Sequence, residues 1–201
     1  MSALVKRSFD VLVALTALVF LMPVMALVTL FVLIFDHPPV FFLQERICRA
    51  GKPFVLVKFR TMRAEDGPEI TSQDDKRKTP LGSFLRRYRL DELPQLVHVL
   101  RGEMSLVGPR PEVPKFIDHT NPDQAVVLSV RPGLVDPAVL AYFNEEEKLR
   151  GVDDPEQYYC EKLRPRKLAL SASYVETAGF WSDLRLLFAA TWRIFGLGNQ
   201  S

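Results

Sequence analysis

The chain has 201 residues, is 48% hydrophobic and carries a formal net charge of +2 at pH 7, so it is long enough for one modest core plus a membrane element. Its two cysteines, Cys48 and Cys160, match no metal-binding spacing and are too few for a disulfide framework, so we expect free thiols in a reducing compartment. The three histidines are scattered, which argues against a histidine-ligated zinc. We expect no nucleic-acid partner.

Residues 11–35 form an uncharged apolar run, "VLVALTALVFLMPVMALVTLFVLIF". A helix of about 25 residues is about 37 Å long, which exceeds a hydrocarbon core of about 30 Å. The run is too long for a signal peptide, and no small-residue cleavage site precedes the "FDHPP" that ends it. We therefore predict a membrane helix in residues 1–36 and a cytosolic, membrane-associated domain in residues 37–201.

Two features favour a helix that enters the membrane and returns to the same face. Pro23 lies near the middle of the run, where it removes a helical hydrogen bond and predicts a kink. Lys6 and Arg7 precede the run and several basic residues follow it within 46–60, which keeps both flanks in the cytoplasm. A single spanning helix that tolerates the proline is the alternative. Asp10 is expected to pair with Arg7 at the headgroup level.

Two stretches rich in β-branched and aromatic residues, 39–47 and 53–62, predict a β-hairpin joined by the turn "CRAGK". Period two places Lys58 and Arg60 on the same face of the second strand. That face is either a solvated edge or part of a binding surface. Residues 63–78 have no apolar period and predict a mobile loop.

Thr79 followed by Pro80 is a helix-start signal. Pro94 is tolerated only in the first turn of a helix, so a second helix is expected to begin near Asp91 and to stop at Gly102. Asp91 would then lie at a helix N-terminus, where unpaired amides and the helix dipole favour a negative charge or a bound phosphate.

An isolated aspartate at that position is most often a simple N-cap. The adjacent Glu92 and the preceding basic run "RRYR" favour a functional site instead. So does "GPRP", because Arg110, held between Pro109 and Pro111, would lose little backbone entropy on binding an anion, and its guanidinium fork suits phosphate. A structural turn with an incidental arginine is the alternative.

The C-terminal third has weaker signals. Residues 131–136, "RPGLVD", predict another rigid turn, and residues 158–179 predict a helix broken near Pro165. Residues 180–196 predict a helix with a tryptophan towards each end, which fits a helix in the bilayer interface and fits a packed core helix almost as well.

These stretches together resemble the bacterial sugar transferase family, the monotopic phosphoglycosyl transferases that initiate glycan assembly. The matching segments cover nearly the whole chain, in the family's order: "KRSFD", "VFFLQERICRAGKPFVLVKFRTM", "LRRYRLDELPQLVHVLRGEMSLVGPRPEVP", "RPGLVDPAVL" and "LRPRKLAL". No extra N-terminal domain precedes them, so the chain resembles the minimal catalytic form.

The resemblance implies a transferase of the EC 2.7.8 type. A UDP-sugar gives its phosphosugar to a polyprenyl (undecaprenyl) phosphate, yielding a polyprenyl-diphosphate sugar and UMP in the first membrane step of glycoconjugate assembly. By the same resemblance, Asp91 is the nucleophile that forms a covalent phosphosugar intermediate. Glu92 assists, through the incoming lipid phosphate or the metal site. Mg²⁺ is the expected cofactor, with Asp91 as a ligand.

The negative diphosphate would repel Asp91, so cations are needed around it. Mg²⁺ binds through one or two carboxylates plus phosphate oxygens. The residues expected to bind substrate are Lys58, Arg60, Arg87, Arg110, Pro111 and Arg131.

The implied architecture is an α+β fold, mainly helical, with a re-entrant membrane helix broken at Pro23, a small β-hairpin and amphipathic interfacial helices around a cytosolic catalytic domain. The implied location is the bacterial inner membrane, with the catalytic domain on the cytoplasmic face and membrane lipids as further partners. The interfacial helices could pair in a homodimer.

Some residues depart from the family pattern. Met22 stands where serine often precedes the proline, and "PGLVDPAVL" stands where many members read "PGITGWAQV". His98 and Glu103 stand where asparagine and aspartate are common, and neither is given a catalytic role. Two other classes of protein stay open: a membrane-anchored metal-dependent phosphohydrolase and a non-catalytic scaffold. The sequence names neither the UDP-sugar nor the glycan pathway.

Overall fold

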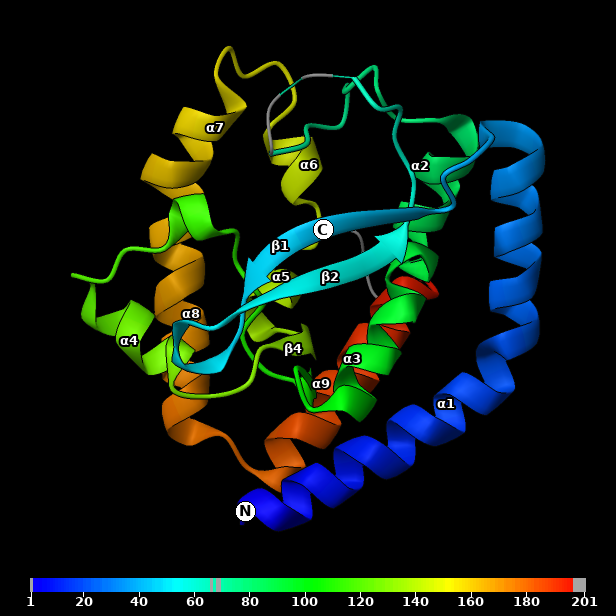
Figure 1. Ribbon diagram of the computed structural model, residues 1–201. Coiled ribbons are helices and arrows are strands. Elements are labelled where there is room, and N and C mark those ends of the chain that lie inside the picture. Colours follow the sequence, from blue (N-terminus) through cyan, green and yellow to red (C-terminus); the bar gives the residue numbers. More distant parts are fainter. Residues whose placement is uncertain (1, 66, 68–69, 197–201) are drawn as a thin grey trace.

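The computed structural model describes residues 2–65, 67 and 70–196, and the chain has the predicted α+β, mainly helical fold (Figure 1). The helices are α1 Ala3–Phe31, α2 Pro80–Arg87, α3 Leu96–Arg101, α4 Pro122–Leu128, α5 Pro137–Ala141, α6 Glu145–Lys148, α7 Pro155–Tyr158, α8 Arg164–Thr177 and α9 Phe180–Ile194. The strands are β1 Phe41–Ile47, β2 Pro53–Phe59, β3 Ser105–Val107 and β4 Gly133–Val135. Short 3₁₀ or π segments are η1 Val32–Asp36, η2 Arg49–Gly51, η3 Leu90–Gln95, η4 Pro114–Phe116 and η5 Tyr159–Leu163.

Helix α1 is long and bent. Figure 1 shows it running along the bottom of the molecule and then turning up along one edge, and Pro23 is the proline inside it. Its missing N–H removes a helical hydrogen bond there, which accounts for the bend. Among the described residues, the segment Ala3–Asp36 is the helix long and apolar enough to cross a membrane.

Both ends of α1 are attached to the rest of the protein. Near its start, Lys6 lies 2.5 Å from the Asp183 carboxylate in α9, and Arg7 donates to the backbone carbonyls at the end of α3 at 2.6 and 2.9 Å. At the far end, in η1, which continues α1, Asp36 accepts a 2.8 Å hydrogen bond from the Thr79 hydroxyl. Arg60 also donates to the backbone there.

The expected pairing of Asp10 with Arg7 is wrong. Asp10 is buried and accepts hydrogen bonds from the Ser105 hydroxyl at 2.7 Å and the Leu106 amide at 3.3 Å. A buried carboxylate needs such donors, and the start of β3 supplies them. Arg7 is occupied by the carbonyls of α3 instead.

Strands β1 and β2 form the predicted antiparallel hairpin, in a register that runs from Phe41 opposite Phe59 to Ile47 opposite Pro53. The second strand ends at Phe59, three residues earlier than predicted, because the chain turns away and Met62 pairs with Lys78 instead. That bridge brings the two ends of the predicted loop together. The predicted helix start at Thr79 is confirmed, since the Thr79 hydroxyl accepts a hydrogen bond from the Gly82 amide at 2.8 Å.

A second, two-stranded sheet was not predicted. Strand β3 pairs in parallel with β4, with Ser105 opposite Gly133 and Val107 opposite Val135. The "RPGLVD" segment is therefore partly a strand rather than only a turn. A Cβ on Gly133 would lie 2.1 Å from the Gly108 backbone nitrogen, so the close approach of the two strands requires a glycine at that position.

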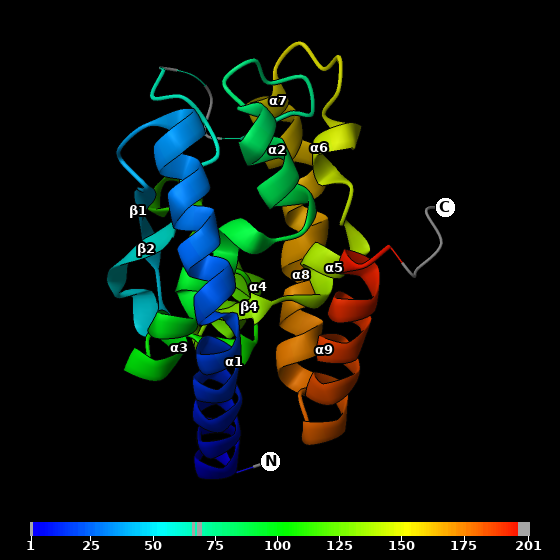
Figure 2. The same cartoon turned by 90° about the vertical axis from the view of Figure 1, so that its right-hand side faces the viewer.

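The C-terminal helices follow the prediction closely. The helix expected to break near Pro165 contains the π-helical segment η5 directly before α8, and Pro165 lies in the first turn of α8. Helix α9 covers the predicted 180–196 region. Figure 1 shows α8 and α9 joined at the bottom of the molecule and diverging from there, and Figure 2 shows α1 along another side.

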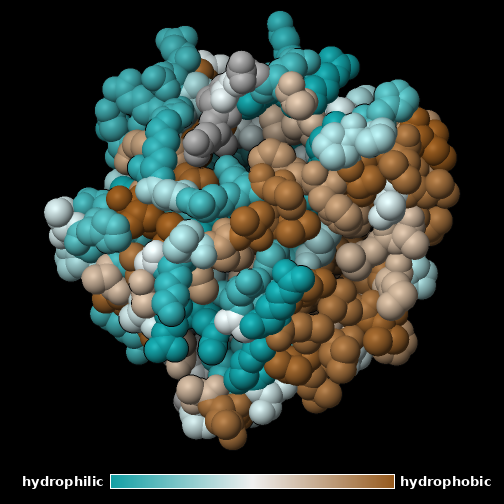
Figure 3. All heavy atoms as spheres, in the orientation of Figure 1, coloured by the Kyte–Doolittle hydropathy of each residue, from teal (hydrophilic) through white to brown (hydrophobic). Residues whose placement is uncertain are grey.

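Three buried clusters form the core, and α1 takes part in two of them. Ala14 packs with residues of β2, α3 and β3, while Val28 and Val32 pack with Phe59 and Leu85. Much of the remaining surface of α1, η1 and α9 is apolar and exposed, including Phe20, Phe35, Trp181 and Phe188. Figure 3 shows the apolar surface concentrated along the edge formed by α1.

Candidate active site

The two adjacent acids lie in η3, which packs against β2 between α2 and α3. Arg89 precedes it in the left-handed conformation, with φ of 56°. The segment is a 3₁₀ turn with Pro94 inside it rather than the α-helix expected from Asp91, because a proline ring disfavours the regular α-helical conformation in the residue before it. The α-helix begins at Leu96. Asp91 and Glu92 are only 4% and 7% exposed.

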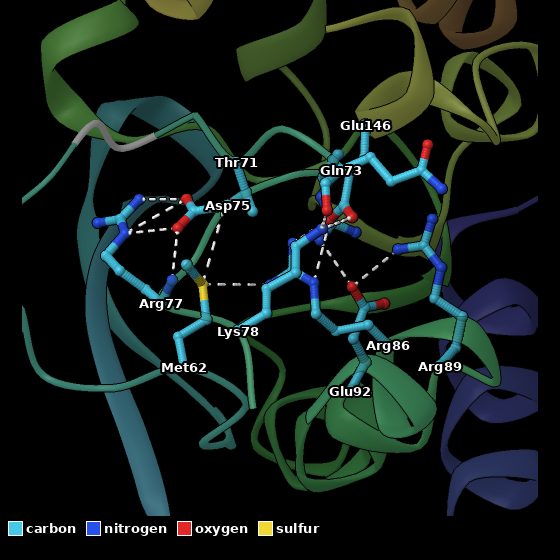
Figure 4. A network of polar contacts seen from close by, with 11 residues as sticks. Met62, Thr71, Gln73, Asp75, Arg77, Lys78, Arg86, Arg89, Glu92 and Glu146 are labelled. Atoms are coloured by element: carbon cyan, nitrogen blue, oxygen red, sulfur yellow. Dashed lines mark hydrogen bonds and ion pairs between the residues drawn. The ribbon is translucent and has the colours of Figure 1, made fainter. Parts of the chain in front are cut away.

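Glu92 is held by two arginines, Arg110 and Arg89, and Figure 4 shows its contact with Arg89. Its Oε1 accepts from Arg110 at 2.6 Å and from Arg89 at 3.0 Å. Burial opposes ionisation, yet the charges of Arg110 and Arg89 hold the pKa of Glu92 well below its usual range. Glu92 is therefore charged at neutral pH, and it orients the Arg110 guanidinium.

Asp91 has the opposite environment. Burial and the neighbouring Glu92 charge raise the pKa of Asp91 above its usual value, although Lys58 and Arg86 act against this. Its Oδ1 is buried and has no hydrogen-bond partner among the described residues. A buried carboxylate oxygen without a donor is costly. It is therefore suited to contact a bound group, as a nucleophile or as a cation ligand.

Lys58 faces the acids from β2. Burial and the charge of Arg86 lower the pKa of Lys58 to about 8, while Asp91 acts in the other direction. Its ammonium lies 5.1 Å from the centre of the Phe42 ring, on the same face of the hairpin. The Lys58 side chain is half-buried and its charge acts on Asp91, so this part of the strand face is not a fully solvated edge.

A buried aspartate holds the Arg110 segment in place. Asp136 accepts hydrogen bonds from the Arg110 backbone amide at 2.6 Å, the Ala138 amide at 2.7 Å and the Ser171 hydroxyl at 3.1 Å. It therefore joins the "GPRP" segment to α5 and α8. The sequence indicated a rigid turn here but gave no sign of this contact, because its partners are 26 and 35 residues away.

Of the other residues expected to bind substrate, only some lie near Asp91 and Glu92. Pro111 is buried next to Arg110, and its carbonyl accepts from Arg46 at 3.0 Å. Arg60 lies elsewhere, since it donates to backbone carbonyls at the end of η1. Arg87 is exposed on α2 above the Tyr88 ring. Arg131 donates to the Gly102 carbonyl at 2.9 Å.

Two arginines beside the acids were not among the expected substrate-binding residues. The charges of Arg86 and Arg89 both act on Asp91, whereas Arg87 between them points away. The helical period of α2 decides which of three close arginines faces the site, and its phase relative to η3 depends on Arg89 being left-handed.

The unassigned pair His98 and Glu103 is structural: the His98 ring accepts from the Val57 amide at 3.1 Å and contacts Glu103 at 2.6 Å.

The residues present fit a magnesium ion that is shared with a phosphate. The described residues contain no cluster of three or more His, Cys, Asp or Glu side chains that would form a complete metal cage. Mg²⁺ does not need one, because it commonly binds through one or two carboxylates plus substrate phosphates. The free Oδ1 of Asp91 is a carboxylate oxygen that could serve as such a ligand.

The site thus combines a buried carboxylate with an unpartnered oxygen and several cations, close to an apolar helix with a large exposed surface. These features are the ones that a site for phosphoryl transfer beside a membrane would need. The chain belongs to the bacterial sugar transferase family, whose family model matches residues 1–196.

Curated relatives of known activity are similar over most of the chain. The UDP-glucose:undecaprenyl-phosphate glucose-1-phosphate transferase of Caulobacter vibrioides is 35% identical over 188 residues, covering 90% of this chain and 66% of the relative. The enzyme of that name in Escherichia coli is 31% identical over 201 residues, covering 96% of this chain and 40% of the relative. The UDP-N-acetylgalactosamine-undecaprenyl-phosphate N-acetylgalactosaminephosphotransferase of Aeromonas hydrophila is 36% identical over 138 residues, covering 66% of this chain and 33% of the relative. The chain thus spans two thirds or less of these relatives' length.

Proposed function

We propose that the protein transfers a phosphosugar from a UDP-sugar to polyprenyl phosphate, releasing UMP. The observation that carries this proposal is the buried Asp91 carboxylate. Its Oδ1 has no partner among the described residues, and the positive charges of Lys58, Arg86 and Arg89 act on it. The relatives are transferases of this kind by name, which supports the same reaction class.

The first step is attack by Asp91 Oδ1 on the β-phosphorus of the UDP-sugar. A bond forms between Asp91 and this phosphorus while the bond to the bridging oxygen breaks, so UMP leaves with that oxygen and an aspartyl phosphosugar remains. In the second step, a phosphate oxygen of the lipid attacks the same phosphorus, and the Asp91 carboxylate leaves. The two-step route divides one difficult transfer into two easier ones.

The surrounding cations have distinct roles in this proposal. Arg110, oriented by Glu92, and Lys58, in its protonated form below about pH 8, face the negative charge that the diphosphate brings. Their preorganised charges stabilise the phosphoryl group as it transfers. When bound, Mg²⁺ would be held by Asp91 and substrate phosphate oxygens and would offset their charge.

The proposed topology is a re-entrant α1 with the catalytic domain on the cytoplasmic face. Both ends of α1 contact the same body of the protein, through Lys6 and Asp183 at one end and Asp36 and Thr79 at the other. A helix that spans the bilayer separates its ends by about 30 Å of hydrocarbon, so its two ends could not both make such contacts in one aqueous compartment. A homodimer through the interfacial helices stays a prediction.

Cysteine labelling tests this topology. In a Cys48→Ser, Cys160→Ser background, a Ser2→Cys variant in inside-out membrane vesicles is expected to react with a membrane-impermeant maleimide as readily as Thr120→Cys in the exposed domain. In intact spheroplasts, neither should react. Labelling of Ser2→Cys in spheroplasts would mean that α1 crosses the membrane.

The function is tested by UMP release from purified protein with Mg²⁺, undecaprenyl phosphate and a panel that includes UDP-glucose and UDP-N-acetylgalactosamine. We expect UMP from at least one donor, with repeated turnover only when the lipid phosphate is present. Without lipid, at most one UMP per protein molecule should be released, as the covalent intermediate forms. Release of sugar phosphate without lipid would identify a phosphohydrolase instead. Binding without turnover of any donor would contradict the proposal and favour a scaffold.

A further inference from the structure

One further acidic side chain, Glu146, contacts an arginine beside Asp91 and Glu92. Glu146, in α6, accepts from both Nε and Nη2 of Arg86 on its Oε1, with Nε at 3.0 Å. Its other oxygen, Oε2, accepts from the Lys78 ammonium at 2.6 Å. Figure 4 shows these three residues meeting directly above Glu92.

Glu146 is itself held in place. Its backbone carbonyl accepts from the Gln73 amide at 2.9 Å, and Lys78 is fixed because it pairs with Met62 across the neck of the loop. Burial opposes ionisation, but the charge of Arg86 and the hydrogen bonds from Lys78 and Arg86 keep the pKa of Glu146 below its usual value. Glu146 is therefore a charged and well-anchored acceptor.

The contact leaves part of Arg86 available. Nε and Nη2 are taken by Glu146, whereas Nη1 contacts only the Met62 sulfur, at 3.8 Å, among the described residues. A thioether is a weak acceptor, so Nη1 can still donate to a stronger one. Arg86 lies on α2, one turn before the acids, and its charge acts on Asp91.

We propose that Glu146 is a positioning residue: it holds the Arg86 guanidinium so that its remaining N–H groups bind the diphosphate of the nucleotide-sugar beside Asp91. This inference rests on the proposed function, because it assigns Arg86 to that donor. Because an exposed ion pair contributes little to stability and the Glu146 side chain is 37% exposed, losing the pair should change the stability of the fold little. If the pair had only a structural role, its loss would leave the binding of a diphosphate unchanged.

The test compares the affinities of UDP and uridine, measured by isothermal titration calorimetry with Mg²⁺. The ratio of the two dissociation constants isolates recognition of the diphosphate. In Glu146→Gln, the preference for UDP over uridine is expected to fall about tenfold or more, because a charge-assisted contact to phosphate is misaligned. Glu147→Gln is the matched control, since Glu147 is exposed on the same turn, and its ratio should stay within twofold of wild type.

A Glu146→Gln ratio equal to that of wild type, or a wild-type protein that does not prefer UDP, would overturn the inference. Uridine affinity should be the same in all three proteins, because a loss there would indicate general damage to the site and would also contradict a positioning role. The measurement does not depend on turnover. The binding result can therefore be interpreted even if the transferase assay fails, so a failure of one proposal can be told from a failure of the other.

Discussion

An Asp91→Asn variant is expected to lose UMP release by a factor on the order of a thousand or more. The amide is a far weaker nucleophile than the carboxylate, and it cannot carry the negative charge that Mg²⁺ would require of its ligand. The measurement is the initial rate of UMP release at saturating donor and lipid, for wild type and variant. Intact-mass spectrometry without lipid should show the phosphosugar adduct only in wild type.

The same substitution is expected to leave the protein as stable as wild type, or slightly more stable. The pKa of Asp91 is raised in the folded protein, so the stability linked to its protonated form is present below the unfolded pKa of about 3.9 and is lost as pH rises through the folded value. Asparagine does not titrate. The difference in melting temperature in favour of Asp91→Asn should therefore grow as pH is raised above about 4.

A variant that loses activity because it unfolds would melt well below wild type at pH 7, and this would contradict the assignment of Asp91 as a poised reacting group. Glu147→Gln is again a useful control, since it removes an exposed carboxylate of the same charge. Full activity in Asp91→Asn would rule out the covalent route.

Much of the fold could be predicted because its signals are local. The alternation of β-branched and aromatic residues predicted the hairpin, Thr79 with Pro80 predicted the start of α2, and Pro23 predicted the bend in α1. The β3–β4 pair could not be predicted in this way. Each strand has three residues, too few for a period, and their pairing depends on a close approach at Gly108 and Gly133.

In the site too, the residues could be predicted from local signals, but the contacts that position them could not. Asp91 and Glu92 were expected from the motif that carries the family resemblance, and Arg110 from its two flanking prolines. The contacts that position them are long-range: Asp136 to Arg110 spans 26 residues and Glu146 to Arg86 spans 60. Arg86 rather than Arg87 faces the acids because of the phase of one short helix and the left-handed Arg89, which a charge pattern does not specify.

A Glu92→Ala variant is expected to lose about 3 kcal/mol of stability at pH 7, at the lower end of the range for breaking a buried ion pair. The Glu92 side chain is 9% exposed, but its partners Arg110 and Arg89 keep 31% and 26% exposure, so water can partly solvate the arginines that are left. The measurement is the melting temperature of wild type and variant in the same detergent or nanodisc.

The pH dependence of this loss distinguishes an ion pair from simple packing. The pKa of Glu92 is lowered in the folded protein, so its contribution to stability is present above the unfolded pKa of about 4.3 and is lost as pH falls further towards the folded value. The difference between wild type and Glu92→Ala should thus shrink below about pH 4. A difference that is the same at pH 3 and pH 7 would mean that the side chain acts by filling space.

The double variant Glu92→Ala, Arg110→Ala separates stability from catalysis. Removing Arg110 as well leaves only Arg89 without its carboxylate partner, instead of two arginines, so the double variant should be more stable than Glu92→Ala alone. UMP release should not recover with it, because Arg110 itself faces the transferring phosphoryl group in the proposed mechanism. If activity recovered together with stability, Glu92 and Arg110 would form only a structural pair, and Asp91 would have to act with Lys58 and Arg86 alone.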